Sequence, residues 1–282
     1  MKRIIRAALI VMLTAGICVS GFELWKINSM YADEERLKDQ MAAYSPQLSS
    51  SQTDTGSNDD DSQDASNISA DSENTASAAD AASTVDTASD GAAEQPSEPE
   101  VKIVNQSIID LQNNVNSDIV GWLTINDTPI DYPFVLTDNN NYYLHANIKK
   151  EKTAAGCIFM DCRCAADLSD FNTVLYGHNM KNKSMFGNLK LFADPEFFDT
   201  HTEGTLYIKN GTYSLEFFAY MIVRSNDDQI YSPSPEQDGF YEYVRKNARL
   251  YRQPSEEGKV VTLSTCAYEF EGARMVLLAV CK

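Results

Sequence analysis

Between residues 119 and 281 the sequence contains eight short runs of β-branched, aromatic and other apolar residues, separated by segments rich in turn-forming residues. Runs of this length and composition, bounded by turn signals, are typical of β-strands. Eight of them without an internal repeat favour a mostly β fold, a closed or nearly closed barrel. The predicted strands cover residues 119–125, 129–136, 156–160, 172–177, 204–209, 213–223, 259–265 and 274–281.

Several short helices are predicted between these strands. Apolar residues recur at helical spacing over 107–115, 184–192 and 235–251. The third helix is an insertion before the strand over 259–265, where it would lie beside one mouth of the barrel, a common place for binding loops. The stretch INDTP over 125–129 predicts a hairpin turn, because Asn126 and Asp127 tolerate turn geometry.

The N-terminus, residues 1–27, is predicted to be a transmembrane signal-anchor. Lys2, Arg3 and Arg6 precede an uncharged stretch from Ala7 to Phe22, and a positive flank favours a cytoplasmic N-terminus. A cleaved signal peptide is the main alternative, but the stretch has no A-x-A-like cleavage site. A single-pass membrane protein whose folded part lies outside the cytoplasm is therefore expected.

Residues 28–100 are predicted to form a stalk and a disordered linker. Residues 51–100 contain thirteen Asp or Glu and no Lys or Arg, and they hold almost no large apolar side chain. Such a segment buries too little apolar surface to offset the entropy of folding. Without it, the formal charge of −18 falls to about −5, from 28 acidic and 23 basic residues. No basic cluster interleaved with aromatics points to nucleic acid.

The remaining residues, 101–282, form the predicted catalytic domain, in which Cys266 is the candidate nucleophile. A thiol nucleophile needs a proton-transfer partner and a group that stabilises the oxyanion. His178 directly follows a predicted strand and a glycine, and Arg274 begins the strand after Cys266. By spacing alone, a buried filler and a nucleophile explain Cys266 equally well. His145 and His201 are expected to be surface or structural residues.

The other cysteines of this domain are expected to have no role in catalysis. Cys162 and Cys164 form a lone C-x-C without a second ligand pair, which does not predict a metal site. Together with Cys157 and Cys281 they allow up to two disulfides, and the reduced state is the expectation for an anaerobic setting. We expect no cofactor and no metal.

Five motifs of this domain resemble those of the sortases, the cysteine transpeptidases of Gram-positive cell surfaces. They are DIVGWLTI, IDYPFV, GCIFMD, YGHNM and TLSTC, the last followed by an arginine. The similarity covers nearly all of 105–282, and the helical insertion before the cysteine strand is similar to that of class B. It implies an eight-stranded barrel, an N-terminal anchor and a catalytic trio of His178, Cys266 and Arg274.

The resemblance also implies a reaction and its partners. The substrates would be secreted proteins with a C-terminal sorting motif, cleaved after threonine through a thioacyl-enzyme. The acceptor would be an amine of a cell-wall precursor, from peptidoglycan. Two alternatives stay open: a thiol protease with water as acceptor, and a non-catalytic surface module that binds peptides. The residues expected to support or line the substrate groove are Ser264, Thr265, Tyr268, Tyr231 and Ser232; Glu269 and Glu271 are candidates to orient His178 or Arg274.

Overall fold

The computed structural model describes residues 2–46, 104–235 and 237–282, with side chains described from Met12 onward. The acidic linker predicted between residues 49 and 100 lies outside these ranges. The predicted division into segments 1–27, 28–100 and 101–282 stays a prediction.

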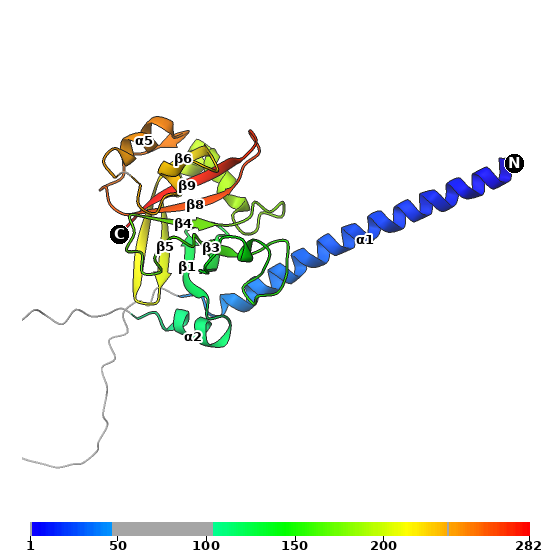
Figure 1. Ribbon diagram of the computed structural model, residues 1–282, viewed down its shortest axis with the longest axis horizontal. Coiled ribbons are helices and arrows are strands. Elements are labelled where there is room, and N and C mark those ends of the chain that lie inside the picture. Colours follow the sequence, from blue (N-terminus) through cyan, green and yellow to red (C-terminus); the bar gives the residue numbers. More distant parts are fainter. Residues whose placement is uncertain (1, 47–103, 236) are drawn as a thin grey trace, which may run out of the picture. The chain divides into compact units, whose positions relative to one another are not determined.

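The described chain contains a closed barrel of eight strands (Figure 1). They pair in the order β5-β1-β2-β3-β4-β8-β9-β6, and β6 pairs back with β5 to close the ring. A ninth strand, β7 (Leu250–Tyr251), adds two residues to the side of β6. The eight barrel strands are β1 (Ile119–Ile125), β2 (Asp131–Val135), β3 (Ile158–Met160), β4 (Asn172–Tyr176), β5 (Glu203–Ile208), β6 (Gly211–Arg224), β8 (Val260–Cys266) and β9 (Ala273–Cys281). The predicted mostly β barrel is confirmed, with each strand within about three residues of its predicted ends.

Two of the pairings are parallel, and one of them places the candidate site. Strand β4 runs parallel to β8, and β2 runs parallel to β3, whereas the other neighbours are antiparallel. The first six residues of β8 are all buried, so this strand is covered on both faces. Its apolar residues therefore follow one another without strict alternation, as is usual for such strands.

The core consists of two hydrophobic clusters. The larger includes Phe217, Leu263 and Leu277, none of which is exposed to solvent. The smaller includes Ile108 of α2 and Trp122 of β1. The short helix α2 (Gln106–Asn114) therefore stabilises the barrel by burying its apolar face against β1.

The described residues form six helices besides α2, of which η2 and α5 overlap predicted helices and are shorter than predicted. They are α1 (Lys2–Ala42), η1 (Tyr142–Leu144), η2 (Gly187–Ala193), α3 (Pro195–Thr200), α4 (Asp228–Tyr231) and α5 (Phe240–Asn247). The helix predicted over 235–251 is reduced to α5, because its last residues, Leu250 and Tyr251, pair with β6 as β7. The segment predicted over 184–192 is the 3-10 helix η2. The turn predicted at INDTP is confirmed, with Asp127 at a φ of 58°.

Among the residues that the structure describes, no helix combines the length and the apolar character needed to cross a membrane. The N-terminal anchor over 1–27 therefore stays a prediction from the sequence.

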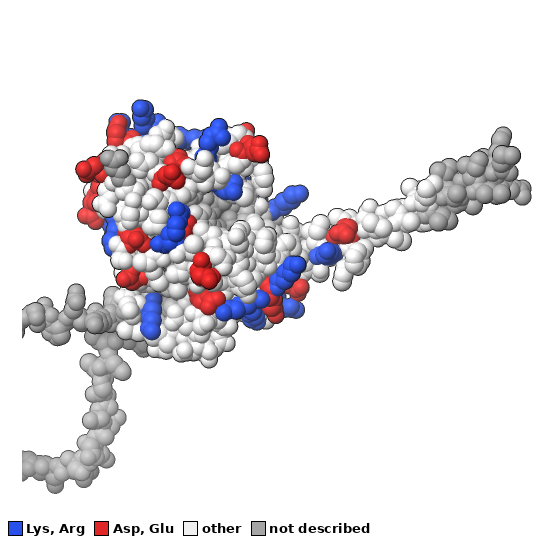
Figure 2. Space-filling view, viewed as in Figure 1, with Lys and Arg blue, Asp and Glu red and all other residues white. Residues whose placement is uncertain are grey.

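Acidic and basic side chains are interspersed on the face of the barrel shown in Figure 2. No large area of one sign covers this face. The mixture agrees with the small net charge that the sequence assigns to the chain outside residues 51–100.

Candidate active site

Cys266 and Arg274 lie directly opposite each other at one end of the barrel. Cys266 is the last residue of β8, Arg274 is the second residue of β9, and their Cα atoms are partners in the antiparallel register. Side chains of such a pair lie on the same face of the sheet, with Cβ atoms about 5 Å apart. The guanidinium and the thiol are thus both available to one bound group.

His178 reaches the same end of the barrel from the neighbouring strand. In the parallel register of β4 and β8, Tyr176 is the partner of Ser264, and the Gly177 amide donates to the Ser264 carbonyl at 3.2 Å. His178 and Cys266 each follow two residues after this pair, so both leave the sheet at the same edge. The three predicted catalytic residues, His178, Cys266 and Arg274, are all half-buried.

Asn179 ties the histidine loop to the nucleophile strand. Its Nδ2 donates to the Cys266 carbonyl oxygen at 2.8 Å. This side chain was missed in the sequence, although it stands next to His178 in the motif YGHNM. Its contact joins two segments 87 residues apart and holds the loop after His178 against the backbone of Cys266.

The imidazole of His178 is oriented by a backbone carbonyl. Its Nε2 lies 2.9 Å from the Leu144 oxygen. Because a carbonyl oxygen only accepts, this hydrogen bond requires the proton on Nε2 and leaves Nδ1 for proton transfer. Gly156 lies against the ring: a Cβ there would stand 3.2 Å from the His178 Cδ2 atom and 2.5 Å from the backbone carbonyl oxygen of Tyr143. The glycine therefore makes room for the histidine.

The guanidinium of Arg274 keeps donors for a substrate. Within the described residues, its Nη1 donates to the Ala273 carbonyl at 3.0 Å. A guanidinium has five N–H donors. Glu269 does not orient this arginine, because its carboxylate pairs with Arg249 at 3.5 Å. Glu271 is exposed in the same loop.

Tyr231 and Ser264 form a contact beside this trio. The Tyr231 hydroxyl and the Ser264 Oγ are 2.9 Å apart, and both residues are buried. Burial raises the pKa of Tyr231 to about 12, although the Ser264 hydrogen bond and the Arg274 charge oppose this shift. The phenol is therefore neutral at physiological pH and close to Arg274.

The other predicted groove residues are placed differently. Ser232 follows α4 and is half-buried, next to Tyr231. Tyr268 is 80% exposed, in the loop between β8 and β9. Thr265 lies on the opposite face of β8 from Cys266, because successive strand residues alternate. Its hydroxyl is buried, with no hydrogen-bond partner in the described part of the chain.

The cysteines other than Cys266 are all free thiols in the described residues. Burial raises the pKa of Cys164 to about 12 and that of Cys281 to about 11. It also raises the pKa of Cys157 well above its usual range. These three are poor nucleophiles at neutral pH. The described residues contain no group of three potential ligands that would hold a metal ion.

The remaining histidines have positions expected of structural or surface residues. His145 is exposed at the end of η1. His201 stacks on the Phe197 ring, with centroids 3.6 Å apart, and its Nδ1 lies 3.0 Å from the Phe197 carbonyl.

Comparison with known proteins identifies the family. The sequence model of the Sortase domain matches residues 123–282. Sortase B of Listeria monocytogenes is 39% identical over 181 residues, which cover 62% of this chain and 73% of that protein. Sortase B of Clostridium perfringens has a structure with a TM-score of 0.57 at 30% identity, covering 62% of this chain and 98% of that one. The structure of a Staphylococcus aureus sortase B–substrate complex has a TM-score of 0.58 at 26% identity, and the match covers 64% of this chain and 86% of that one.

The match to the Sortase domain and to the sortase B proteins defines a cysteine transpeptidase that acts on sorting motifs. The chain belongs to the sortase family, and its relatives place it in class B. The family membership removes the alternative of a non-catalytic binding module.

Proposed function

We propose that this enzyme cleaves the C-terminal sorting motif of secreted proteins after threonine and transfers the threonyl group to an amine of a cell-wall precursor. The observation that carries the proposal is the meeting of Cys266, Arg274 and His178 at one end of β8, β9 and β4. A nucleophile, an oxyanion donor and a proton carrier are the groups that acyl transfer needs.

In the first half of the reaction the Cys266 thiol gives its proton to Nδ1 of His178, and the sulfur attacks the threonine carbonyl. Arg274 donates hydrogen bonds to the oxygen, which becomes negative as the tetrahedral intermediate forms. His178 delivers a proton from Nδ1 to the leaving amine as the amide bond breaks. The product is a thioester between Cys266 and the threonine, and the C-terminal fragment leaves as a free amine.

In the second half an acceptor amine attacks the thioester. His178 removes a proton from this amine, the C–S bond breaks, and Cys266 is regenerated as a new amide forms. Transfer prevails over hydrolysis only where the amine reacts faster than water. Ser264 and Tyr231 would line the groove for the sorting motif, with Ser232, Thr265 and Tyr268 as further candidates from the sequence.

The proposal includes a membrane anchor formed by residues 1–27, which would hold the catalytic domain outside the cell. It rests on the uncharged stretch from Ala7 to Phe22 and the basic residues before it. Membrane fractionation of the full chain and of a chain lacking residues 1–27 tests it. Recovery of both chains in the soluble fraction would contradict an anchor.

Peptide turnover with single substitutions tests the catalytic assignment. The full chain is incubated with sorting-type peptides that contain threonine, and the released fragment is measured. Cys266→Ala, His178→Ala and Arg274→Ala should each abolish release. Cys162→Ala should keep it, because Cys162 contacts Asn140 through its backbone amide alone among the described contacts. Normal turnover by Cys266→Ala would overturn the mechanism.

A further inference from the structure

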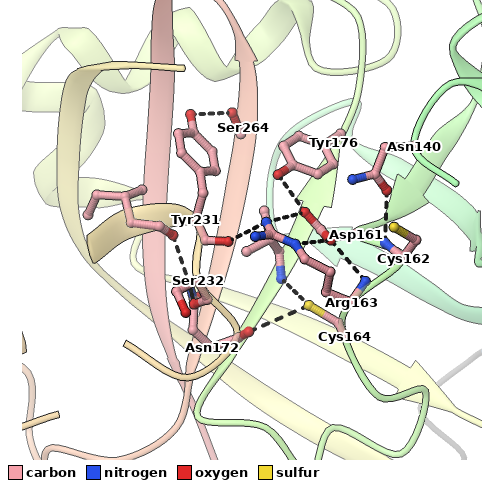
Figure 3. Close-up of polar contacts among 12 residues, drawn as sticks. Asn140, Asp161, Cys162, Arg163, Cys164, Asn172, Tyr176, Tyr231, Ser232 and Ser264 are labelled. Carbon is pink, nitrogen blue, oxygen red and sulfur yellow. Dashed lines mark hydrogen bonds and ion pairs between the residues drawn. The ribbon is translucent and has the colours of Figure 1, made fainter. Parts of the chain in front are cut away.

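A buried carboxylate, that of Asp161, lies in the loop after β3. The Asp161 side chain has no exposed surface. Its Oδ1 accepts from the Arg163 amide and Nε, each at 2.9 Å, and its Oδ2 accepts from Arg163 Nη2 at 2.8 Å and from the Tyr176 hydroxyl at 2.9 Å. Figure 3 shows these contacts converging on one carboxylate. Its charge is thus compensated by four donors, as a buried charge requires.

Arg163 also reaches a second segment of the chain. Its Nη2 donates to the Tyr231 carbonyl at 2.7 Å, across 68 residues of sequence (Figure 3). The Arg163 side chain is 54% exposed, so the carboxylate and not burial holds it in place. Because a guanidinium is planar and rigid, fixing it on Asp161 also fixes the direction of the donor that meets Tyr231.

The backbone around Tyr231 is held by hydrogen bonds from other segments of the chain. Helix α4 has only four residues, too few to be stable alone. The side chain of Asn172 donates to the Ile230 and Ser232 carbonyls at 2.8 and 2.9 Å, and its amide donates to the Pro233 carbonyl at 3.0 Å. Arg163 supplies the donor for Tyr231 between them, so four consecutive carbonyls are held by two residues.

The Tyr231 side chain connects α4 to β8, the strand that ends at Cys266. Its hydroxyl contacts Ser264, two residues before Cys266 on the same face of β8. Its ring stacks with that of Tyr176, with centroids 6.1 Å apart. Since Tyr176 also donates to Asp161, the carboxylate supports Tyr231 through both its backbone and its ring.

We propose that Arg163, held by Asp161, is a positioning residue that sets the place of Tyr231 beside Cys266 and so determines how well the sorting motif is bound. The inference rests on the proposed function, because it assigns Tyr231 to the groove of that site. Arg163 acts through Tyr231 and has no part in bond breaking. Its loss should therefore weaken substrate binding and leave the chemical step largely unchanged.

Kinetics of the full chain with a sorting peptide test the inference. Arg163→Lys keeps a positive charge for Asp161 but lacks the fork that spans the carboxylate and the carbonyl. It should raise KM roughly fivefold to tenfold and change kcat by less than about twofold. Arg245→Lys is the matched control, because Arg245 makes the same fork onto Glu242 on the surface of α5. It should leave both constants unchanged.

A double-mutant cycle with Tyr231→Phe distinguishes positioning from general destabilisation. If Arg163 acts through the Tyr231 hydroxyl, then Arg163→Lys should raise KM far less in the Tyr231→Phe chain than in the wild type. Additive effects, or an unchanged KM in Arg163→Lys while the wild type turns over, would overturn the inference alone. Absence of turnover by the wild type would overturn the proposed function, and the inference with it.

Discussion

At the scale of single residues, the hydrogen bond from Asn179 to the Cys266 carbonyl links the loop that carries His178 to the end of β8. Replacing Asn179 with alanine removes the 2.8 Å contact and leaves His178 less firmly placed. We expect a loss of about 1 kcal/mol in the free energy of unfolding and roughly a tenfold lower kcat. Asn182→Ala, in the same loop, is the control, since the Asn182 side chain accepts hydrogen bonds from the Ser184 amide and hydroxyl and, among the described residues, makes none to Cys266 or its strand. Equal kcat in both variants would contradict the role of Asn179.

The cysteines differ in accessibility in a way that chemical labelling can measure. Burial raises the pKa of Cys164 to about 12, and Cys157 is buried as well. We expect iodoacetamide at pH 7.5 to modify the half-buried Cys266 at least tenfold faster than either, because only an accessible thiolate reacts. Peptide mapping by mass spectrometry follows each site. Labelling of Cys164 at the rate of Cys266 would contradict the buried network around it.

The candidate trio was recognisable from the sequence, but its supporting residues were not. His178 and Cys266 follow apolar runs and Arg274 begins one, but it was the resemblance of the surrounding motifs to those of the sortases that singled out the three residues. Arg163 and Asn172 act on carbonyls 58 to 68 residues away, and no local pattern encodes such a contact. The motif GCIFMDCRC drew attention to its cysteines, whereas its aspartate and arginine make the contacts that reach the site.

At the scale of elements, the strands followed the sequence closely because each is a short apolar run with turn residues at both ends. The insertion between β6 and β8 did not. Its helical periodicity over 235–251 continues past α5, yet Leu250 and Tyr251 pair with Tyr220 and Ala219 of β6. Tertiary pairing thus overrode a local helical preference, which is weak compared with burial and strand hydrogen bonds.

The turn before β3 offers a test at this scale. Gly156 has a φ of 60°, and a Cβ there would come within 2.5 Å of the Tyr143 oxygen. Gly156→Ala should therefore lower the free energy of unfolding by about 1–3 kcal/mol, measured by denaturant titration. It should also lower kcat, because the ring of His178 lies on the same side. Gly258→Ala is the control, since a Cβ there meets only a Val280 methyl at 3.8 Å. Equal stability of the two variants would contradict the crowding at Gly156.

At the scale of the whole molecule, the buried carboxylate makes stability depend on pH. Burial by itself raises the pKa of Asp161, but the hydrogen bonds from Arg163 and Tyr176 outweigh it and hold this pKa below its usual range. A carboxylate whose pKa is lower in the folded than in the unfolded state stabilises the fold when it is ionised. This stabilisation is complete above the unfolded-state pKa of about 3.9, and it is lost as the pH falls through the pKa of the folded state. We expect the free energy of unfolding to fall between pH 5 and about pH 2, and to fall less steeply in Asp161→Asn. The same slope in both chains would contradict this.

The negative charge of the chain is concentrated in one part of the sequence, residues 51–100. The acidic segment accounts for most of the formal charge of −18, and the remaining chain is nearly balanced. The composition of the barrel therefore does not indicate a strongly charged partner. Its substrate groove is expected to recognise a peptide by the shape and hydrogen bonds around Tyr231 and Arg274.

Intact-mass spectrometry of the full chain with a set of threonine-containing sorting peptides tests the central claim most directly. Wild-type chain and Cys266→Ala are incubated with each peptide, with and without an amine acceptor. We predict a thioacyl adduct on the wild type alone, which the amine converts to a ligated peptide. An adduct released only as free acid would contradict the transfer to an amine, and an equal adduct on Cys266→Ala would contradict the assignment of the nucleophile.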